Sequence, residues 1–235
     1  MSTLPTLTST KYVTTLPSNK KSIDFRPFLV KEEKIFLLAI ESGENSMMIQ
    51  AVKNVIDNCT FNQFDINKLP MVDLEWIFLE LRKKSKGEIV ELRKKCSNEK
   101  CEQRVNFVVN LEEVKLDGEM PDNKIFLQDD IGIVLRYPSV GILDMLTDTM
   151  SVQDQFNMIR ESIDCVFTND EVFPKDEVSI EDMDSFLDSI TDTKFKEIDT
   201  FFKSVPQLKW ENKNIVCEKC GTINEVMLKG LKNFL

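Results

Sequence analysis

The chain has 235 residues, of which 42% are hydrophobic and 30% are charged, and its formal net charge is −10. This length is sufficient for one sizeable core or two small ones, and the composition is typical of a helix-rich globular protein. The sequence contains no histidine, which excludes Ser-His-Asp and Cys-His nucleophilic systems as usually built, and any zinc site with a histidine ligand.

Residues 1–22 are predicted to form an extended N-terminal arm. The stretch is rich in Ser, Thr and Pro, and it has too few large apolar side chains to form a hydrophobic core of its own. It also lacks the basic-then-apolar order of a secretory signal, and no apolar run in the chain approaches the ~18 residues of a membrane span. We therefore expect a reducing cytoplasm, where paired cysteines hold a metal more often than a disulfide.

Residues 23–86 are predicted to be a helical region. A first helix ends at Gly43, a second covers residues 45–59, and a third begins near Pro70 and ends before Gly87. Proline in the first turn and glycine past the end are the usual helix signals. The residues predicted to line the buried faces are Ile35, Leu38, Ala39, Met48, Val52, Val55, Cys59, Leu74, Ile77, Phe78 and Leu81.

Residues 87–140 and 206–235 are predicted to form a β region. The segments "EIVELRKK" and "QRVNFVVNLEEV" are β-branched and partly alternating, and they flank Cys96 and Cys101 as the two arms of a hairpin. Two further strands are expected in "NKIFLQDDIGIVLRYPSV". Near the C-terminus, "VCEKCGTINEV" carries Cys217 and Cys220 between two strand-like arms.

Residues 141–205 are predicted to be an inserted helical segment, which makes the expected fold class α+β. Helical periodicity extends through "SVQDQFNMIRESIDCVF", "SIEDMDSFLDSI" and "TKFKEIDTFFKSV", and Ser179 and Thr191 are N-cap candidates. Between Glu161 and Thr200 there are thirteen acidic residues against three lysines. The acidic surplus of the chain is therefore concentrated in this segment.

The two cysteine pairs predict one metal site. Tetrahedral zinc takes four ligands, and two hairpins that each present two thiolates supply a split four-cysteine zinc ribbon. The predicted ligands are Cys96, Cys101, Cys217 and Cys220. Four protein ligands leave no position for water or substrate, so the zinc would be structural. The alternative is that these cysteines are buried thiols without a ligand, as is expected for Cys59 and Cys165 on apolar helical faces.

Several segments, in collinear order from about residue 16 to the end, resemble the baseplate proteins of T4-type contractile-tailed bacteriophages. They are "LPSNKKSIDFRPFLVKEEKIFLLA", "FDINKLPMVDLEWIFLELRKKSKGE", "CSNEKC", "IVLRYPS", "FKEIDTFFKSVPQL", "VCEKCG" and "LKGLKNFL". The resemblance implies a structural or assembly protein of the central baseplate hub, without an enzymatic reaction and without a membrane. It also implies other hub proteins as partners in a hetero-oligomeric tail, and the same four cysteines as metal ligands. The host cytoplasm is then the compartment of assembly, and retention in the virion baseplate is left open.

Two other functions are kept as alternatives. The first is a zinc-ribbon nucleic-acid-binding or transcription factor, because residues 82–104 carry nine Lys or Arg against four Glu. A pI near 4.8 argues against it, since such domains are usually basic. The second is an enzyme that uses carboxylates of residues 161–200, which would require a concave pocket. Both charged stretches are equally explained as solvated surface. The N-terminal arm and the C-terminal "LKNFL" are candidates for docking into neighbouring subunits.

Overall fold

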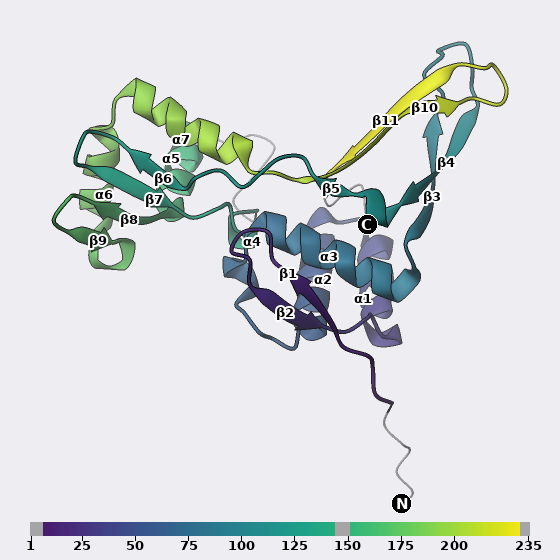
Figure 1. Cartoon of the computed structure of the whole chain (residues 1–235), viewed down its shortest axis with the longest axis horizontal. Helices are drawn as coiled ribbons and strands as arrows, with labels where there is room; N and C mark the ends of the chain where they lie inside the picture. The colour runs from purple at the N-terminus through teal and green to yellow at the C-terminus, as the bar shows by residue number, and fades with distance from the viewer. Residues whose placement is uncertain (1–6, 144–150, 231–235) are drawn as a thin grey trace, which may run out of the picture. The chain divides into compact units, whose positions relative to one another are not determined.

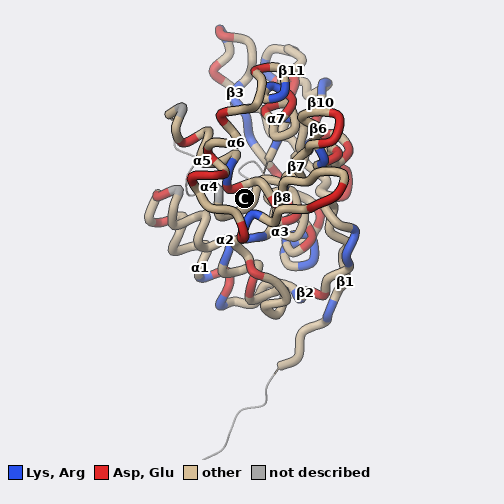
Figure 2. The backbone as a smooth tube through the Cα atoms, turned by 90° about the vertical axis from the view of Figure 1, so that its left-hand side faces the viewer, with Lys and Arg blue, Asp and Glu red and all other residues tan. Residues whose placement is uncertain are grey.

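The computed structural model describes residues 7–143 and 151–230, and these form an α+β structure (Figure 1). The expected fold class is confirmed. The chain divides into two compact units: the first comprises residues 1–66, 72–117 and 207–235, and the second comprises residues 67–71 and 118–206. By sequence, the second unit has twenty Asp and Glu against eight Lys and Arg, and the charged positions are coloured in Figure 2. The charge asymmetry of the sequence therefore follows the division into units.

The first unit begins with a small hairpin of β1 (Tyr12–Thr15) and β2 (Ser22–Phe25). Phe25 is 1% exposed and Leu16 is 4% exposed. The backbone N–H of Ser18 donates to Oδ1 of the buried Asp73 at 2.9 Å. For residues 7–22 the structure thus differs from the predicted extended arm, whereas residues 1–6 and the C-terminal "LKNFL" lie outside the described residues. The hairpin is held by two apolar side chains and by hydrogen bonds to distant residues, which the composition of the stretch does not reveal.

Three helices follow: α1 (Val30–Ser42), α2 (Asn45–Cys59) and α3 (Met71–Lys86), with a short 3₁₀ turn, η1 (Ile66–Lys68), before α3. Helix α1 ends at Gly43, whose φ of 69° is the left-handed conformation that glycine adopts at low cost. Most of the predicted helix faces are confirmed as buried. Leu38 is an exception, because it is 57% exposed, and Ile35 and Met48 are half-buried.

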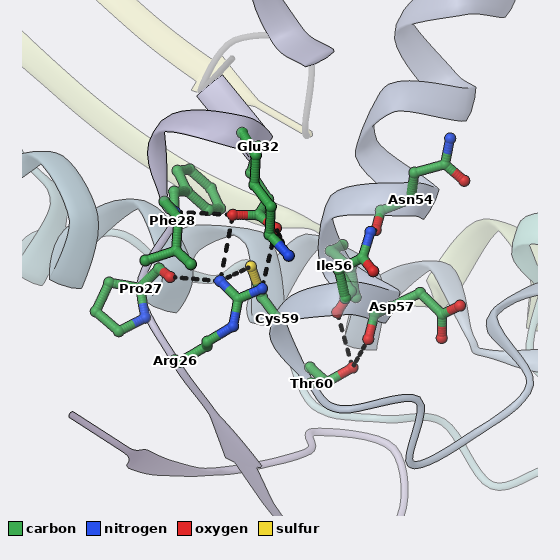
Figure 3. Close-up of polar contacts among 12 residues, drawn as sticks. Arg26, Pro27, Phe28, Glu32, Asn54, Ile56, Asp57, Cys59 and Thr60 are labelled. Atoms are coloured by element: carbon green, nitrogen blue, oxygen red, sulfur yellow. Dashed lines mark hydrogen bonds and ion pairs between the residues drawn. The ribbon is translucent and has the colours of Figure 1, made fainter. Parts of the chain in front are cut away.

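An ion pair inside the first unit joins the end of β2 to α1 (Figure 3). Nη2 of Arg26 donates to Oε1 of Glu32 at 2.9 Å, and Oε2 of Glu32 accepts from the backbone N–H of Leu29 at 2.8 Å. Burial raises the pKa of Glu32, but these hydrogen bonds outweigh burial and lower the pKa overall. The Cys59 thiol lies 3.6 Å from the Arg26 guanidinium, and burial raises the pKa of Cys59 to about 12. Cys59 is therefore a core thiol, as its helical position predicts.

Two long hairpins complete the first unit. β3 (Ile89–Lys95) pairs with β4 (Arg104–Asn110), and β10 (Leu208–Val216) pairs with β11 (Ile223–Lys229). β10 also pairs with the short β5 (Lys115–Leu116), which follows the 3₁₀ turn η2 (Leu111–Glu113). Alternate residues of β4 and β11 are buried, and they pack into one core in which Phe107 stacks on Trp210 at 6.0 Å. This shared core brings together two hairpins that are far apart in sequence.

The second unit is an antiparallel sheet with helices. The strand order is β6 (Lys124–Phe126), β7 (Gly132–Leu135), β8 (Ile163–Phe167) and β9 (Val172–Pro174). The helices are α4 (Val140–Leu143), α5 (Val152–Ser162), α6 (Ile180–Asp188) and α7 (Asp192–Ser204), and η3 (Lys175–Glu177) is a 3₁₀ turn. Ser179 and Thr191 cap α6 and α7, as predicted.

The structure corrects the predicted insert of residues 141–205 in two respects. The main segment of the second unit begins at Gly118 and not at residue 141, because β6 and β7 form one sheet with β8. The helix expected over residues 151–167 ends at Ser162, and residues 163–167 form β8. The apolar residues at positions 163–167 are compatible with both helical and strand periodicity. They form a strand because they pair with β7 and β9.

Candidate metal centre

The four predicted ligands lie in the turns at the tips of the two long hairpins. The backbone N–H of Cys96 donates to the Gln103 carbonyl at 3.0 Å and closes the first turn. The backbone N–H of Cys217 donates to the Thr222 carbonyl at 2.9 Å and closes the second. Gly221 has a φ of 69°, the left-handed conformation that lets the second turn follow Cys220 directly. Each turn therefore presents two thiols at the end of a hairpin.

The structure brings all four sulfurs together. The Sγ atoms of Cys96, Cys101, Cys217 and Cys220 lie within 4.8 Å of one another. Those of Cys96 and Cys220 are 3.7 Å apart, and those of Cys101 and Cys217 are 3.9 Å apart. Four sulfurs around a zinc ion at Zn–S distances of about 2.3 Å are about 3.8 Å apart, so the arrangement fits tetrahedral zinc. All four cysteines are free thiols. The first three are buried, and Cys220 is exposed.

A buried asparagine connects the two turns. Asn224, which is 2% exposed, accepts from the backbone N–H of Ser97 through Oδ1 at 2.7 Å. Its Nδ2 donates to the carbonyls of Ile215 and Thr222 at 3.2 Å and 3.0 Å. Asn224 is not among the residues that the cysteine pattern predicts for the site. The alternation of β11 places it on the buried face, and a polar residue at such a position is the signal that identifies it.

The pKa values of Cys220 and Cys101 are shifted in opposite directions. Hydrogen bonding with the Thr222 hydroxyl, whose oxygen lies 3.2 Å from the sulfur, and with the Thr222 backbone lowers the pKa of Cys220 to about 6. For Cys101 a hydrogen bond from the Gln103 backbone lowers the pKa, but burial and the neighbouring Cys220 and Cys217 sulfurs outweigh it and raise the pKa to about 11. Cys220 therefore ionises more readily than Cys101.

A comparison with protein families shows to which family the chain belongs. A family model described as T4 bacteriophage base plate protein matches residues 9–235. The chain belongs to this family. The match includes both cysteine hairpins and the whole second unit, and it confirms the resemblance seen in the sequence. Comparisons with curated proteins and with solved structures found no match.

Two further features concern the alternative functions: a cavity in the second unit and the length of the helices. A cavity of about 420 Å³ in the second unit is lined by Arg136, Tyr137 and Ser139 of the "RYPS" turn. Its two carboxylates are in ion pairs, Asp164 with Arg136 at 3.4 Å and Glu161 with Lys175. Over the described ranges 7–143 and 151–230, no helix combines the length and apolar character of a membrane span.

Proposed function

We propose that the chain is a structural or assembly protein of the central hub of a contractile-tailed phage baseplate. Membership of the baseplate family supports this role, and it implies interaction with other baseplate components. We propose further that the partners are hub proteins, that the chain acts through protein–protein contacts rather than through an enzymatic reaction, and that assembly takes place in the host cytoplasm.

We also propose that Cys96, Cys101, Cys217 and Cys220 hold one structural zinc ion. The convergence of four sulfurs from two distant hairpins is the observation that carries this proposal. When bound, zinc supplies a cross-link between the hairpins and neutralises part of the thiolate charge. Since cysteine ligands bind as thiolates, binding of zinc releases protons and should become tighter as the pH rises.

Two measurements test these proposals separately. Elemental analysis of the purified chain should give one zinc per chain, and a value well below one would contradict the zinc proposal. Affinity purification from phage-infected cells, followed by mass spectrometry, should recover hub proteins of the baseplate. Recovery of only outer baseplate components would contradict the hub assignment and leave membership of the baseplate intact.

The basic residues of β3 and β4 keep a zinc-ribbon nucleic-acid factor as the second candidate. This function requires binding to a DNA fragment at low salt, with an affinity that falls steeply as salt rises. Absence of such binding would remove it.

A further inference from the structure

The outer face of the β3–β4 hairpin carries more basic than acidic residues. Val105, Phe107 and Val109 are buried, so alternation places Arg104, Asn106 and Val108 on the outer face. The register pairs Lys95 with Arg104, Arg93 with Asn106 and Glu91 with Val108, which adds two cations and one carboxylate to the same face. These cations, namely Arg93, Lys95 and Arg104, are exposed and form no ion pair within residues 7–143 and 151–230.

Charge repulsion on this face destabilises the folded chain when no other surface covers it. Lys95 and Arg104 are directly opposite on adjacent strands, where like charges are destabilising. Two apolar side chains of the same hairpin are also exposed, Ile89 at 58% and Val108 at 53%. A second surface with anions opposite these cations would relieve the repulsion, and it would also cover the two apolar side chains.

The second unit has a surface of the opposite charge at its sheet edge. β9 is the last strand of the sheet and contains Val172, which is 59% exposed, and Ile180 at the start of α6 is 61% exposed. Five exposed carboxylates lie between the β8–β9 turn and the first turn of α6, and within the part of the chain that the structure describes none of them is in an ion pair. They are Asp170, Glu171, Asp176, Glu177 and Glu181.

We propose that the outer face of β3–β4 in one copy of this chain binds the β9–η3 edge in a second copy. The two surfaces are complementary in charge, and each contributes exposed apolar residues to the contact. A nucleic acid would engage the basic face alone and would be repelled by the net charge of −10. A second copy supplies carboxylates to the basic face and cations to the acidic edge. Because the two surfaces differ, the association is head-to-tail and not a two-fold dimer.

Sedimentation velocity of the purified, zinc-loaded chain tests the association. Raising the salt from about 50 mM to about 500 mM shortens the Debye length from roughly 14 Å to roughly 4 Å, which weakens contacts between exposed charges. The sedimentation coefficient should rise with protein concentration at the lower salt and return to the monomer value at the higher salt. A monomer at both salts and all concentrations would overturn the proposal.

Neutralised variants identify the surfaces. The face variant carries Arg93→Gln, Lys95→Gln and Arg104→Gln, and the edge variant carries Asp176→Asn, Glu177→Gln and Glu181→Gln. Each alone should remain monomeric, while an equimolar mixture should stop at a dimer, because one variant keeps the face and the other keeps the edge. The matched control, Lys21→Gln with Lys34→Gln and Lys213→Gln, removes three exposed lysines elsewhere and should associate like the unmodified chain.

The variants also distinguish self-association from misfolding, from a general effect of net charge and from nucleic-acid binding. Circular dichroism and zinc content of each variant should equal those of the unmodified chain, which excludes misfolding as the cause. A control variant that dissociates as far as the face variant would overturn the proposal, because the effect would then follow net charge alone. If the unmodified chain is monomeric but binds a DNA fragment, and the face variant does not, the basic face serves nucleic acid and the self-association is refuted.

Discussion

Replacing Cys217 with serine should remove most of the stability that zinc provides. Cys217 is 1% exposed, and its sulfur lies 3.9 Å from that of Cys101, a residue 116 positions earlier in the chain. A cross-link that closes a loop of this length stabilises the folded state by about 5 kcal/mol on the chain-entropy model. That amount is comparable with the whole free energy of unfolding of a small domain, which is about 5–15 kcal/mol.

The assay combines urea unfolding with zinc measurement. The free energy of unfolding of Cys217→Ser should be about 3–5 kcal/mol lower than that of the unmodified chain, because loss of one ligand opens the tetrahedral site. Zinc content should fall well below one per chain. Chelator treatment should lower the urea midpoint of the unmodified chain and leave that of Cys217→Ser nearly unchanged, since the variant has no tightly held metal to lose.

Cys165→Ser is the matched control. Cys165 is a half-buried thiol of β8 outside the sulfur cluster, so its replacement should leave the zinc content at one per chain. If Cys217→Ser keeps its zinc and its urea midpoint, or if Cys165→Ser loses zinc to the same extent, the reasoning from sulfur geometry is refuted.

Two predictions concern buried carboxylates of the first unit. Asp73 is fully buried and accepts from the backbone N–H and the hydroxyl of Ser18, so Asp73→Ala should lower the free energy of unfolding by about 1–3 kcal/mol, while Asp73→Asn, which keeps an acceptor, should cost less in thermal unfolding. The folded-state pKa of Glu32 lies below its ordinary value of 4.5, so the Arg26–Glu32 pair stabilises the fold above that pH and loses its contribution as the pH falls through the folded pKa. The acid-induced loss of stability should therefore be shallower in Glu32→Gln, and an identical pH profile would contradict this role.

The clustering of the four cysteines is predictable from the sequence because it follows from local sequence patterns. A pair of cysteines in a turn between two β-branched segments identifies a hairpin tip, and two such tips supply the ligand number of zinc. The helices α2 and α3 are likewise predictable, since Val55 and Ile77 repeat at helical spacing with neighbours that are also buried.

The features that the sequence does not predict depend on contacts between distant residues. Residues 163–167 continue a helical pattern and become a strand only because β7 and β9 pair with them. The N-terminal hairpin is fixed by Asp73, which is 55 residues beyond its hydrogen-bond partner Ser18. Local periodicity identifies neither the strands that pair with residues 163–167 nor the carboxylate that binds Ser18. The boundary of the second unit and the fold of the N-terminal segment therefore cannot be predicted from it.

The path of the chain leads to a last prediction about the second unit. The first unit ends one of its segments at Asp117 and resumes at Gln207, and these two residues are hydrogen-bonded to each other. The backbone N–H of Asp117 donates to the Gln207 carbonyl at 3.0 Å, and the backbone N–H of Gln207 donates to Oδ1 of Asp117 at 2.8 Å. The two ends of the insert at residues 118–206 are therefore held together by the first unit itself.

A short Gly-Ser linker in place of residues 118–206 should consequently leave the cysteine hairpins folded. Shortening a flexible connection lowers the entropy cost of joining its ends by about 0.6 kcal/mol for each halving of its length. Leu69, which is 5% exposed among residues of the second unit, would lose its cover, so the deletion is best combined with Leu69→Ser. The shortened chain should still bind one zinc, and Cys217→Ser in that background should abolish binding. If the shortened chain holds no zinc although it is soluble and helical, the second unit is required to assemble the sulfur cluster, and the two units are not independent folding elements.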